Sequence, residues 1–169
     1  EKLLEKIEFY TSLGFKGVKI GAGGFEKAKG HFISDDPLEA ADFEEAKLSA
    51  VRSHFGKDLW LMMDAHMGNH SNKTWDLTTA LAVARAVEQF ELVFLEEPLH
   101  YTRPDWYHEL CISTKTPIAG GECLTSFSEW QTFIDQNCFR IGQPDAAFVS
   151  GLGAFMQIAA GLHKKGSSI

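Results

Sequence analysis

Short apolar runs alternate along this chain with longer segments in which apolar residues recur every three or four positions. A run of a few consecutive apolar residues is typical of a strand buried on both faces, whereas the longer spacing is typical of an amphipathic helix. The pattern predicts strands at 17–20, 59–63, 92–95, 117–119 and 139–141, and helices at about 3–13, 36–54, 75–89, 103–113, 126–136 and 152–164. Regular alternation of this kind predicts an α/β fold, in which helices cover a parallel sheet.

Local signals place several element boundaries. Pro37 fits the first turn of the second helix, and Thr74 is the expected N-cap of the third. Ser126, followed three residues later by Glu129, has the pattern of a capping box. The stretch 21–34 is a long glycine-bearing segment, and we interpret it as a lid or binding loop.

Acidic residues follow four of the predicted strands. The strand at 92–95 continues into Glu96-Glu97-Pro98, although buried strands seldom end in charges that are not paired, solvated or bound to a metal. Corresponding positions after other strands hold Asp64, Glu122 and Asp145. Parallel α/β proteins carry their chemistry at the carboxyl ends of strands. Because consecutive strands each contribute an acid, the pattern favours a closed barrel over an open sheet with a single switch point.

Three of these acids, Asp64, Glu96 and Glu122, are candidate metal ligands. Carboxylates that converge on one mouth of a barrel repel one another, and a hard divalent cation relieves that repulsion. Ligation by oxygen alone suits Mg²⁺. Each acid taken singly could instead cap the helix that follows it, but three in succession favour the metal. For Glu97, a supporting contact to the site and a helix cap remain equally open.

Two further side chains fall near this predicted site. His66 lies two residues after Asp64, so an extended backbone would direct both side chains to the same face, and a histidine there can transfer protons near neutral pH. The alternative is a loop histidine bonded to a backbone carbonyl. Lys19 ends its own strand and could neutralise or orient an anionic substrate. Its alternative is an ion pair with a neighbouring strand-end acid.

Composition narrows the classes of partner and compartment. The 169 residues carry a net charge of −7, with 44% hydrophobic and 12% aromatic residues, which indicates a folded globular chain. We therefore expect no nucleic-acid partner and no membrane partner. No apolar stretch is long enough to span a bilayer, and no signal peptide is apparent. Three cysteines without metal-site spacing predict reduced thiols in a cytoplasmic protein.

Four motifs occur in order along the chain: Met63-Asp64-Ala65-His66, Leu95-Glu96-Glu97-Pro98, Gly121-Glu122-Cys123 and Gln143-Pro144-Asp145. Together they resemble the enolase superfamily, specifically its mandelate racemase-like branch. The resemblance implies a modified TIM barrel with a separate capping domain. It also implies a Mg²⁺ ion, held by Asp64, Glu96 and Glu122, that stabilises the enolate formed when a base removes the proton α to a carboxylate. Asp145 would be the acidic half of a His–Asp dyad.

The chain departs from the branch pattern at two positions. Many members carry Lys-x-Lys at the second strand, with the second lysine as a base, whereas this chain has Lys19-Ile20-Gly21. Many carry asparagine two residues after the first metal ligand, whereas this chain has His66. An Asp-x-His arrangement is similar to that of galactonate and mannonate dehydratases, in which the histidine transfers a proton.

The same correspondence gives an expected extent. Residues 1–169 would form a single partial barrel domain, covering strands two to six of eight, without the capping domain. A full barrel takes about 250 residues, so we expect a fragment. The dyad histidine would lie on the next strand, which would begin near 167–169.

These observations lead to one functional hypothesis and two alternatives. The hypothesis is a Mg²⁺-dependent dehydratase of a sugar acid, in which His66 protonates the departing hydroxyl and Lys19 assists at the substrate carboxylate. The alternatives are a racemase or cycloisomerase that uses the same enolate, and a catalytically incomplete fragment. Open strand edges at 18–20 and 139–141 further predict self-association as a homo-oligomer.

Overall fold

The computed structural model describes residues 2–23, 25–26, 31–32, 36–68 and 74–169. Its centre is a five-stranded parallel sheet in the order β1-β4-β5-β6-β7. The strands are β1 (Gly17–Gly21), β4 (Trp60–Asp64), β5 (Phe94–Glu96), β6 (Ile118–Gly120) and β7 (Ile141–Gly142). Neighbours in the sheet are therefore also neighbours along the chain, apart from the short hairpin of β2 (Phe25–Glu26) and β3 (His31–Phe32).

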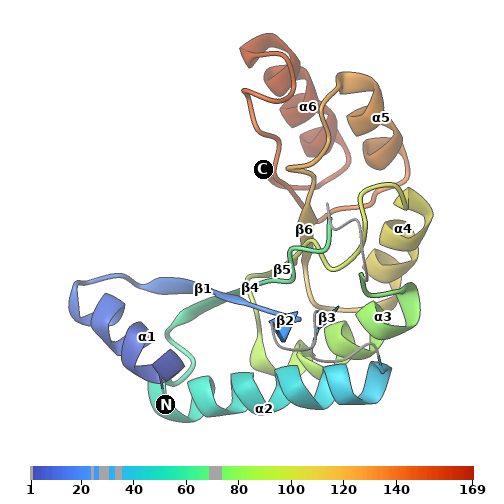
Figure 1. Cartoon of the computed structure of the whole chain (residues 1–169). Helices are drawn as coiled ribbons and strands as arrows, with labels where there is room; N and C mark the ends of the chain where they lie inside the picture. Colours follow the sequence, from blue (N-terminus) through green and yellow to red (C-terminus); the bar gives the residue numbers. More distant parts are fainter. Residues whose placement is uncertain (1, 24, 27–30, 33–35, 69–73) are drawn as a thin grey trace.

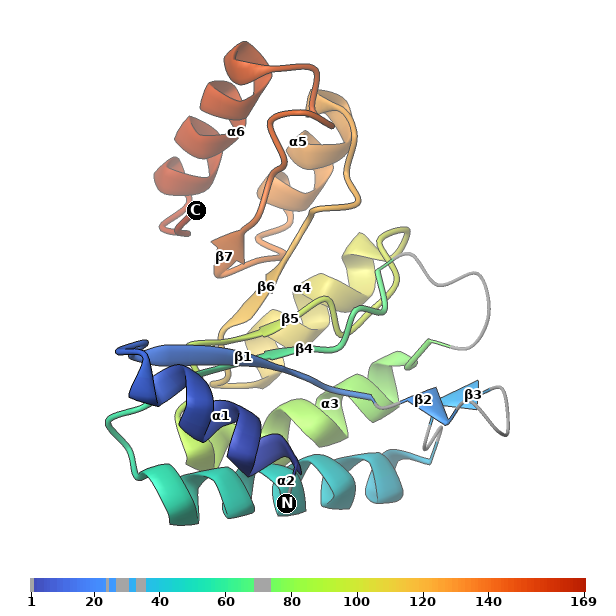
Figure 2. The ribbon, with the colours of Figure 1, turned by 60° about the vertical axis from the view of Figure 1, so that its left-hand side comes forward.

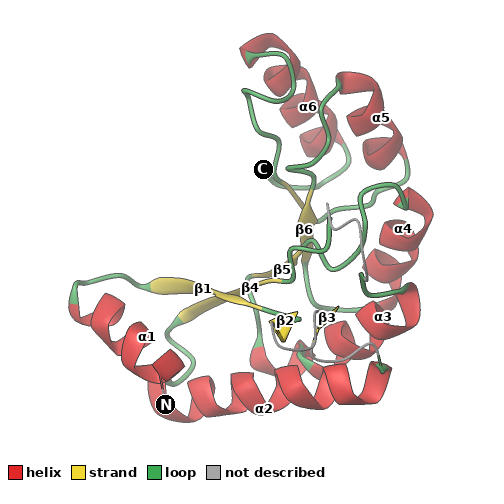
Figure 3. Ribbon diagram, viewed as in Figure 1, coloured by secondary structure: helices red, strands yellow, loops and turns green. Residues whose placement is uncertain are grey.

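Helices separate the strands of the parallel sheet and lie outside it. They are α1 (Lys2–Ser12), α2 (Pro37–Phe55), α3 (Leu77–Ala86), α4 (Pro104–Ser113), α5 (Phe127–Asp135) and α6 (Leu152–Lys164), with a short 3₁₀ helix, η1 (Glu88–Phe90), after α3. Figure 1 shows the elements following an arc, with the strands on its inner side and α2 to α6 along its outer side. The secondary-structure colouring of Figure 3 makes the same division clear. The predicted α/β architecture is confirmed.

The hydrophobic core lies between the sheet and these helices. Strand residues that point outward from the arc, such as Leu61, Met63 and Leu95, are completely buried. They face apolar residues of the helices, among them Leu48 and Val83, which are also completely buried. Burying each such side chain contributes about 1.5–3 kcal/mol, so this layer fixes the strands and therefore the positions at which they end.

Several predicted boundaries differ from the structure. The third helix begins at Leu77, because the Asp76 carboxylate, and not Thr74, accepts the capping hydrogen bond from the Thr79 amide at 2.8 Å. The predicted strand at 139–141 is displaced to Ile141–Gly142. Its first residue, Phe139, is instead buried, and its ring stacks on that of Phe133 with centroids 5.2 Å apart. The segment 21–34, interpreted as a lid or binding loop, includes the antiparallel pair of β2 and β3, and its residues 24, 27–30 and 33–34 lie outside the described part of the chain. The capping box at Ser126 and Glu129 is confirmed.

The last residues of the chain reach the outer edge of β7. Ser168 forms a parallel bridge with Ile141, accepting from the Gly142 amide and donating to the Arg140 carbonyl, both at 2.9 Å. The edge that was expected to be open is therefore paired along part of its length. At the other end of the arc, Figure 2 shows β1 with α1 packed below it. In the described part of the chain, no helix is both long and apolar enough to cross a membrane.

Candidate metal centre

The ends of β4 and β5 bring two of the predicted metal ligands side by side. Asp64 and Glu96 are register partners in the parallel pair, and the Ala65 amide donates to the Glu96 carbonyl at 2.9 Å. Register thus fixes both carboxylates at the same edge of the sheet. Only 4% of the Glu96 side chain and 20% of the Asp64 side chain are exposed, so their negative charges are largely withdrawn from water.

A tight turn after β6 positions the third predicted ligand. Gly121, directly before Glu122, has a φ of +109°, a conformation that side chains rarely adopt. A Cβ atom at this position would lie 2.3 Å from the indole ring of Trp130. The turn therefore requires glycine, both for its backbone angle and for the ring packed beneath it.

Lys19 occupies the space between Asp64 and Glu96. Its ammonium group donates to Glu96 Oε2 at 2.6 Å and lies 3.0 Å from Asp64 Oδ2. Of the two interpretations open from the sequence, the structure shows the ion pair with neighbouring strand-end acids. The ammonium group compensates two carboxylates that would otherwise repel each other.

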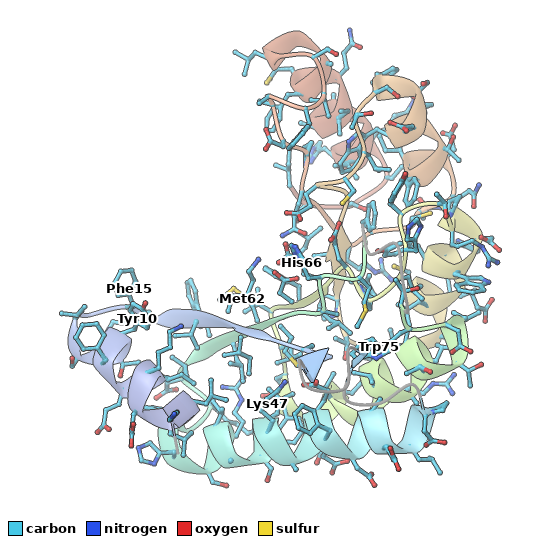
Figure 4. All side chains as sticks on the ribbon, in the orientation of Figure 1. Tyr10, Phe15, Lys47, Met62, His66 and Trp75 are labelled. Atoms are coloured by element: carbon cyan, nitrogen blue, oxygen red, sulfur yellow. The ribbon has the colours of Figure 1, made fainter. Side chains whose placement is uncertain are left out.

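His66 connects Asp64 to Glu122. Its Nδ1 atom lies 3.7 Å from Asp64 Oδ1 and 3.9 Å from Glu122 Oε1, and 66% of its side chain is exposed. The backbone of His66 has a φ of +52°, and Glu97 has a φ of +43°. Left-handed backbone at non-glycine residues is uncommon and concentrates at functional sites. Figure 4 shows His66 and Met62 on the inner side of the arc. Met62 is the register partner of Lys19.

The donor set fits a hard cation. Within the described residues, Asp64 Oδ1 is buried and has no hydrogen-bond partner. A buried carboxylate oxygen without a partner is costly, and a bound cation would satisfy it. Asp64, Glu96 and Glu122 together offer only oxygen atoms, the donors preferred by Mg²⁺. The chemistry of these donors therefore fits the metal.

Glu97 is a buried member of the same cluster. Only 2% of the residue is exposed, and its carboxylate fills the space where a Cβ atom on Gly68 would lie. Burial, reinforced by the negative charge of Glu122, raises the pKa of Glu97 to about 7. The Cys123 thiol hydrogen-bonds this carboxylate, and burial together with the Glu97 charge raises the pKa of Cys123 to about 12. Glu97 thus contacts the site and is not a solvent-exposed helix cap, and Cys123 is a participant that the sequence argument missed.

Among the described residues, the three potential ligand atoms that lie near one another do not match the predicted set. One donor atom each from His66, Glu97 and Glu122 lie within 4.8 Å of one another. Lys19 lies between Asp64 and Glu96 and contacts both carboxylates. His66 lies between Asp64 and Glu122, within 4 Å of each. The structure thus brings all of these side chains to one edge of the sheet, without gathering Asp64, Glu96 and Glu122 around a single point.

Asp145 borders this region across a cavity of about 410 Å³. The cavity is lined by Tyr101, Glu122, Cys123, Thr125, Asp145 and Phe148. Asp145 is exposed, and its carboxylate accepts a hydrogen bond from the Ala147 amide at 2.7 Å. Its position beside Glu122 suits a group that acts on a ligand held in the cavity. Tyr101 and Thr125 were not among the residues picked out from the sequence, because neither follows a strand directly.

A second ion pair lies on the opposite side of β1, where α2 packs against the sheet. Glu44 of α2 is fully buried, pairs with Lys47, and accepts from the Gly23 amide at 2.8 Å. The Lys47 ammonium donates to the Gly21 carbonyl at 2.6 Å. Burial raises the pKa of Glu44, and the charge of Lys47 opposes that shift. The pair therefore links α2 to the end of β1. Figure 4 shows Lys47 between α2 and the strands.

Comparisons with known proteins agree with this geometry. The family model described as "Enolase C-terminal domain-like" matches residues 2–168. Among curated proteins, L-talarate/galactarate dehydratase of Salmonella typhimurium is 34% identical over 158 residues, which are 94% of this chain and 35% of that protein. D-galactonate dehydratase of Xanthomonas euvesicatoria is 28% identical, over 94% of this chain and 38% of its own length. The chain thus spans little more than a third of these curated relatives.

Solved structures give the same relationship. L-talarate dehydratase from Polaromonas sp. JS666, crystallised with Mg and L-glucarate, superposes with a TM-score of 0.81 at 30% identity, over 98% of this chain and 41% of that one. The 3,6-anhydro-D-galactonate cycloisomerase of Zobellia galactanivorans gives 0.80 at 26% identity, with the same coverage. The arc of strands and helices is thus part of a TIM-type barrel, as predicted. The chain belongs to the family of enolase C-terminal domain-like proteins.

Proposed function

We propose that the protein is a Mg²⁺-dependent dehydratase that removes water from a sugar acid. The observation that carries this proposal is the edge at which β4, β5 and β6 end. There, Asp64, Glu96 and Glu122 offer oxygen donors, and His66 lies within 4 Å of two of them. Relatives named as dehydratases of talarate, galactarate and galactonate support the reaction class.

Asp64, Glu96 and Glu122 would hold the ion, which when bound supplies positive charge to the substrate carboxylate and to the charge that develops there. Lys19 would contribute a second positive charge at the same carboxylate. The cavity beside Glu122 would hold the rest of the substrate, with the Tyr101 and Thr125 hydroxyl groups able to bond its hydroxyl groups.

Two proton transfers would complete the elimination. Asp145 would orient the dyad histidine implied by the family resemblance, which would remove the proton α to the carboxylate. His66 would donate a proton to the departing β-hydroxyl group, so that it leaves as water. The enol product would then rearrange to a 2-keto-3-deoxy acid.

Replacing His66 tests this assignment. In a full-length form that includes the dyad histidine, His66→Asn should lower the rate of keto-acid formation from a responsive sugar acid by about 10²–10⁴-fold, the usual contribution of a positioned proton donor. Because the proposed ligands are all carboxylates, Mg²⁺ affinity measured by calorimetry should stay within about threefold. His163→Asn, at an exposed position in the last turn of α6, is the matched control and should leave both quantities unchanged. Unaltered turnover in His66→Asn would remove this residue from the mechanism.

A racemase or cycloisomerase is the second candidate, favoured by the similarity to the Zobellia cycloisomerase. Gly21, where many branch members carry the second lysine, argues against a two-base racemase unless His66 supplies the other base. Incubation with a panel of sugar acids in D₂O separates the two functions. Deuterium exchange at the α-carbon without loss of water would favour the racemase over the dehydratase.

A further inference from the structure

Lys19 competes for the same oxygen atoms as the proposed metal. Its ammonium group lies 2.6 Å from Glu96 Oε2 and 3.0 Å from Asp64 Oδ2. A divalent cation bound by these carboxylates would lie only a few ångströms from the ammonium group, and two cations at that distance repel strongly. Full occupancy by both is therefore unfavourable.

The three side chains differ in their freedom to move. Glu96 and Asp64 end paired strands, and their side chains are only 4% and 20% exposed. Lys19 is 43% exposed at the side chain, and its ammonium group sits on a flexible four-carbon stem. When a cation enters, the lysine is the partner that can leave without disturbing the sheet.

We propose that Lys19 is an exchangeable counter-ion of this site. It neutralises Asp64 and Glu96 in the metal-free protein and leaves those oxygen atoms when Mg²⁺ binds. Its ammonium group then becomes available to the carboxylate of the substrate. The inference rests on the proposed function for the identity of the two ligands. It makes binding ordered, with the cation first and the carboxylate second.

Calorimetric titration of Mg²⁺ into the metal-free protein, without substrate, tests the exchange. Lys19→Met should bind Mg²⁺ about tenfold more tightly, or about 1.4 kcal/mol, because no ammonium group has to be displaced. The metal-free variant should also melt at a lower temperature than the wild type, since two carboxylates then face each other uncompensated. Lys19→Gln, which keeps a hydrogen-bond donor but not the charge, should bind Mg²⁺ more tightly as well and serves if the Met variant does not fold.

The control is Lys57→Met. Lys57 lies 3.4 Å from Glu91 in a pair whose side chains are 78% and 68% exposed. This variant loses the same charge away from the site, and its Mg²⁺ affinity should equal that of the wild type. A general effect of net charge would instead tighten binding in both variants.

Lysine acetylation read by peptide mass spectrometry follows the exchange in the unaltered protein. Lys19 should acetylate faster in Mg²⁺ than in EDTA, whereas Lys57 should react equally in both. Unchanged or weaker Mg²⁺ binding in the Lys19 variants would overturn the proposal, as would equal reactivity of Lys19 with and without the ion. Since no substrate is present, these results stand whether or not the protein proves to be a dehydratase.

Discussion

Two lysines lie on opposite sides of β1, and each pairs with carboxylates in a different setting. Lys19 faces the inner side, is 43% exposed at its side chain, and bridges acids from two neighbouring strands. Lys47 comes from α2, is 16% exposed, and pairs with Glu44, whose side chain is fully buried. The first arrangement is open to solvent at its lysine, whereas the carboxylate of the second is fully enclosed by protein. Burial, and not the mere presence of an ion pair, separates a group that can exchange from one that holds the scaffold.

The largest expected effect comes from breaking the buried pair of Glu44 and Lys47. Lys47→Met leaves the Glu44 carboxylate buried without its partner, which should lower the free energy of unfolding by about 3–5 kcal/mol. Urea unfolding monitored by circular dichroism measures this. The double variant Glu44→Gln/Lys47→Met is the control and should recover much of the loss, because no buried charge remains. A loss below about 1 kcal/mol in Lys47→Met would mean that water reaches Glu44.

The same variant should be strongly dependent on pH. Burial already raises the pKa of Glu44 above its ordinary value of 4.5, and removing Lys47 removes a charge that lowers it. For a carboxyl whose folded-state pKa is raised, the stability contribution is fully present below the unfolded pKa and is lost as pH rises through the folded pKa. The difference between Lys47→Met and wild type should therefore be smaller at pH 5 than at pH 8. A difference that does not vary between these two values would contradict the assignment to Glu44.

A smaller effect is expected at the exchangeable pair. In EDTA, Lys19→Met should lower the free energy of unfolding by about 1 kcal/mol, since Lys19 is partly exposed and screened by solvent. Raising the salt concentration from about 0.05 to 0.5 M should shrink this difference, because the Debye length falls to a few ångströms. The Lys47→Met difference should hardly change over the same range. Equal salt sensitivity of the two variants would remove the distinction between them.

The smallest effect is expected at the fully solvated pair. Lys57→Met should change the free energy of unfolding by no more than about 0.5 kcal/mol, as is usual for exposed ion pairs. With the two preceding variants it completes a series of three ion pairs whose lysine side chains are 16%, 43% and 78% exposed. If Lys57→Met proved as destabilising as Lys47→Met, burial could not be the controlling variable.

Much of the fold and the location of the candidate site could be predicted from the sequence because the same pattern indicates both. An apolar run that stops at an acid marks a buried strand and also marks the edge at which it ends. Asp64 and Glu96 lie at those ends, in register with each other. The resemblance of the surrounding motifs to a known family then supplied a chemical role for the acids, which geometry alone leaves open.

Other features depend on three-dimensional contacts that the local pattern does not contain. The pairing of Lys19 with Glu96, 77 positions later in the chain, requires strands that are not adjacent in the sheet to converge across β4. Glu44 stands in the buried stripe of α2 between Ala40 and Leu48, where an apolar residue would be expected. An acid at such a position is a usable signal for a buried ion pair, although it does not identify the partner.

The displaced strand β7 has a similar origin. Phe139, two residues before β7, fits the apolar pattern of a buried strand. Its ring instead packs in an aromatic cluster with Tyr107, Trp130 and Phe133. Competition between two ways of burying the same ring cannot be decided by periodicity, because both give the same spacing of apolar residues.

The order of strands in the parallel sheet has a consequence for how the chain folds. Each strand of that sheet pairs with the one before it, apart from the insertion of the small β2–β3 hairpin. A growing chain can therefore add one strand and one helix at a time to a surface that already exists, without waiting for a distant segment. Each step closes a single crossover between neighbouring strands, and sequential pairing of this kind suits folding from the N-terminus during synthesis. The acid-bearing strand ends are then assembled in the order in which they are translated, and Lys19 is in place before either of its acidic partners.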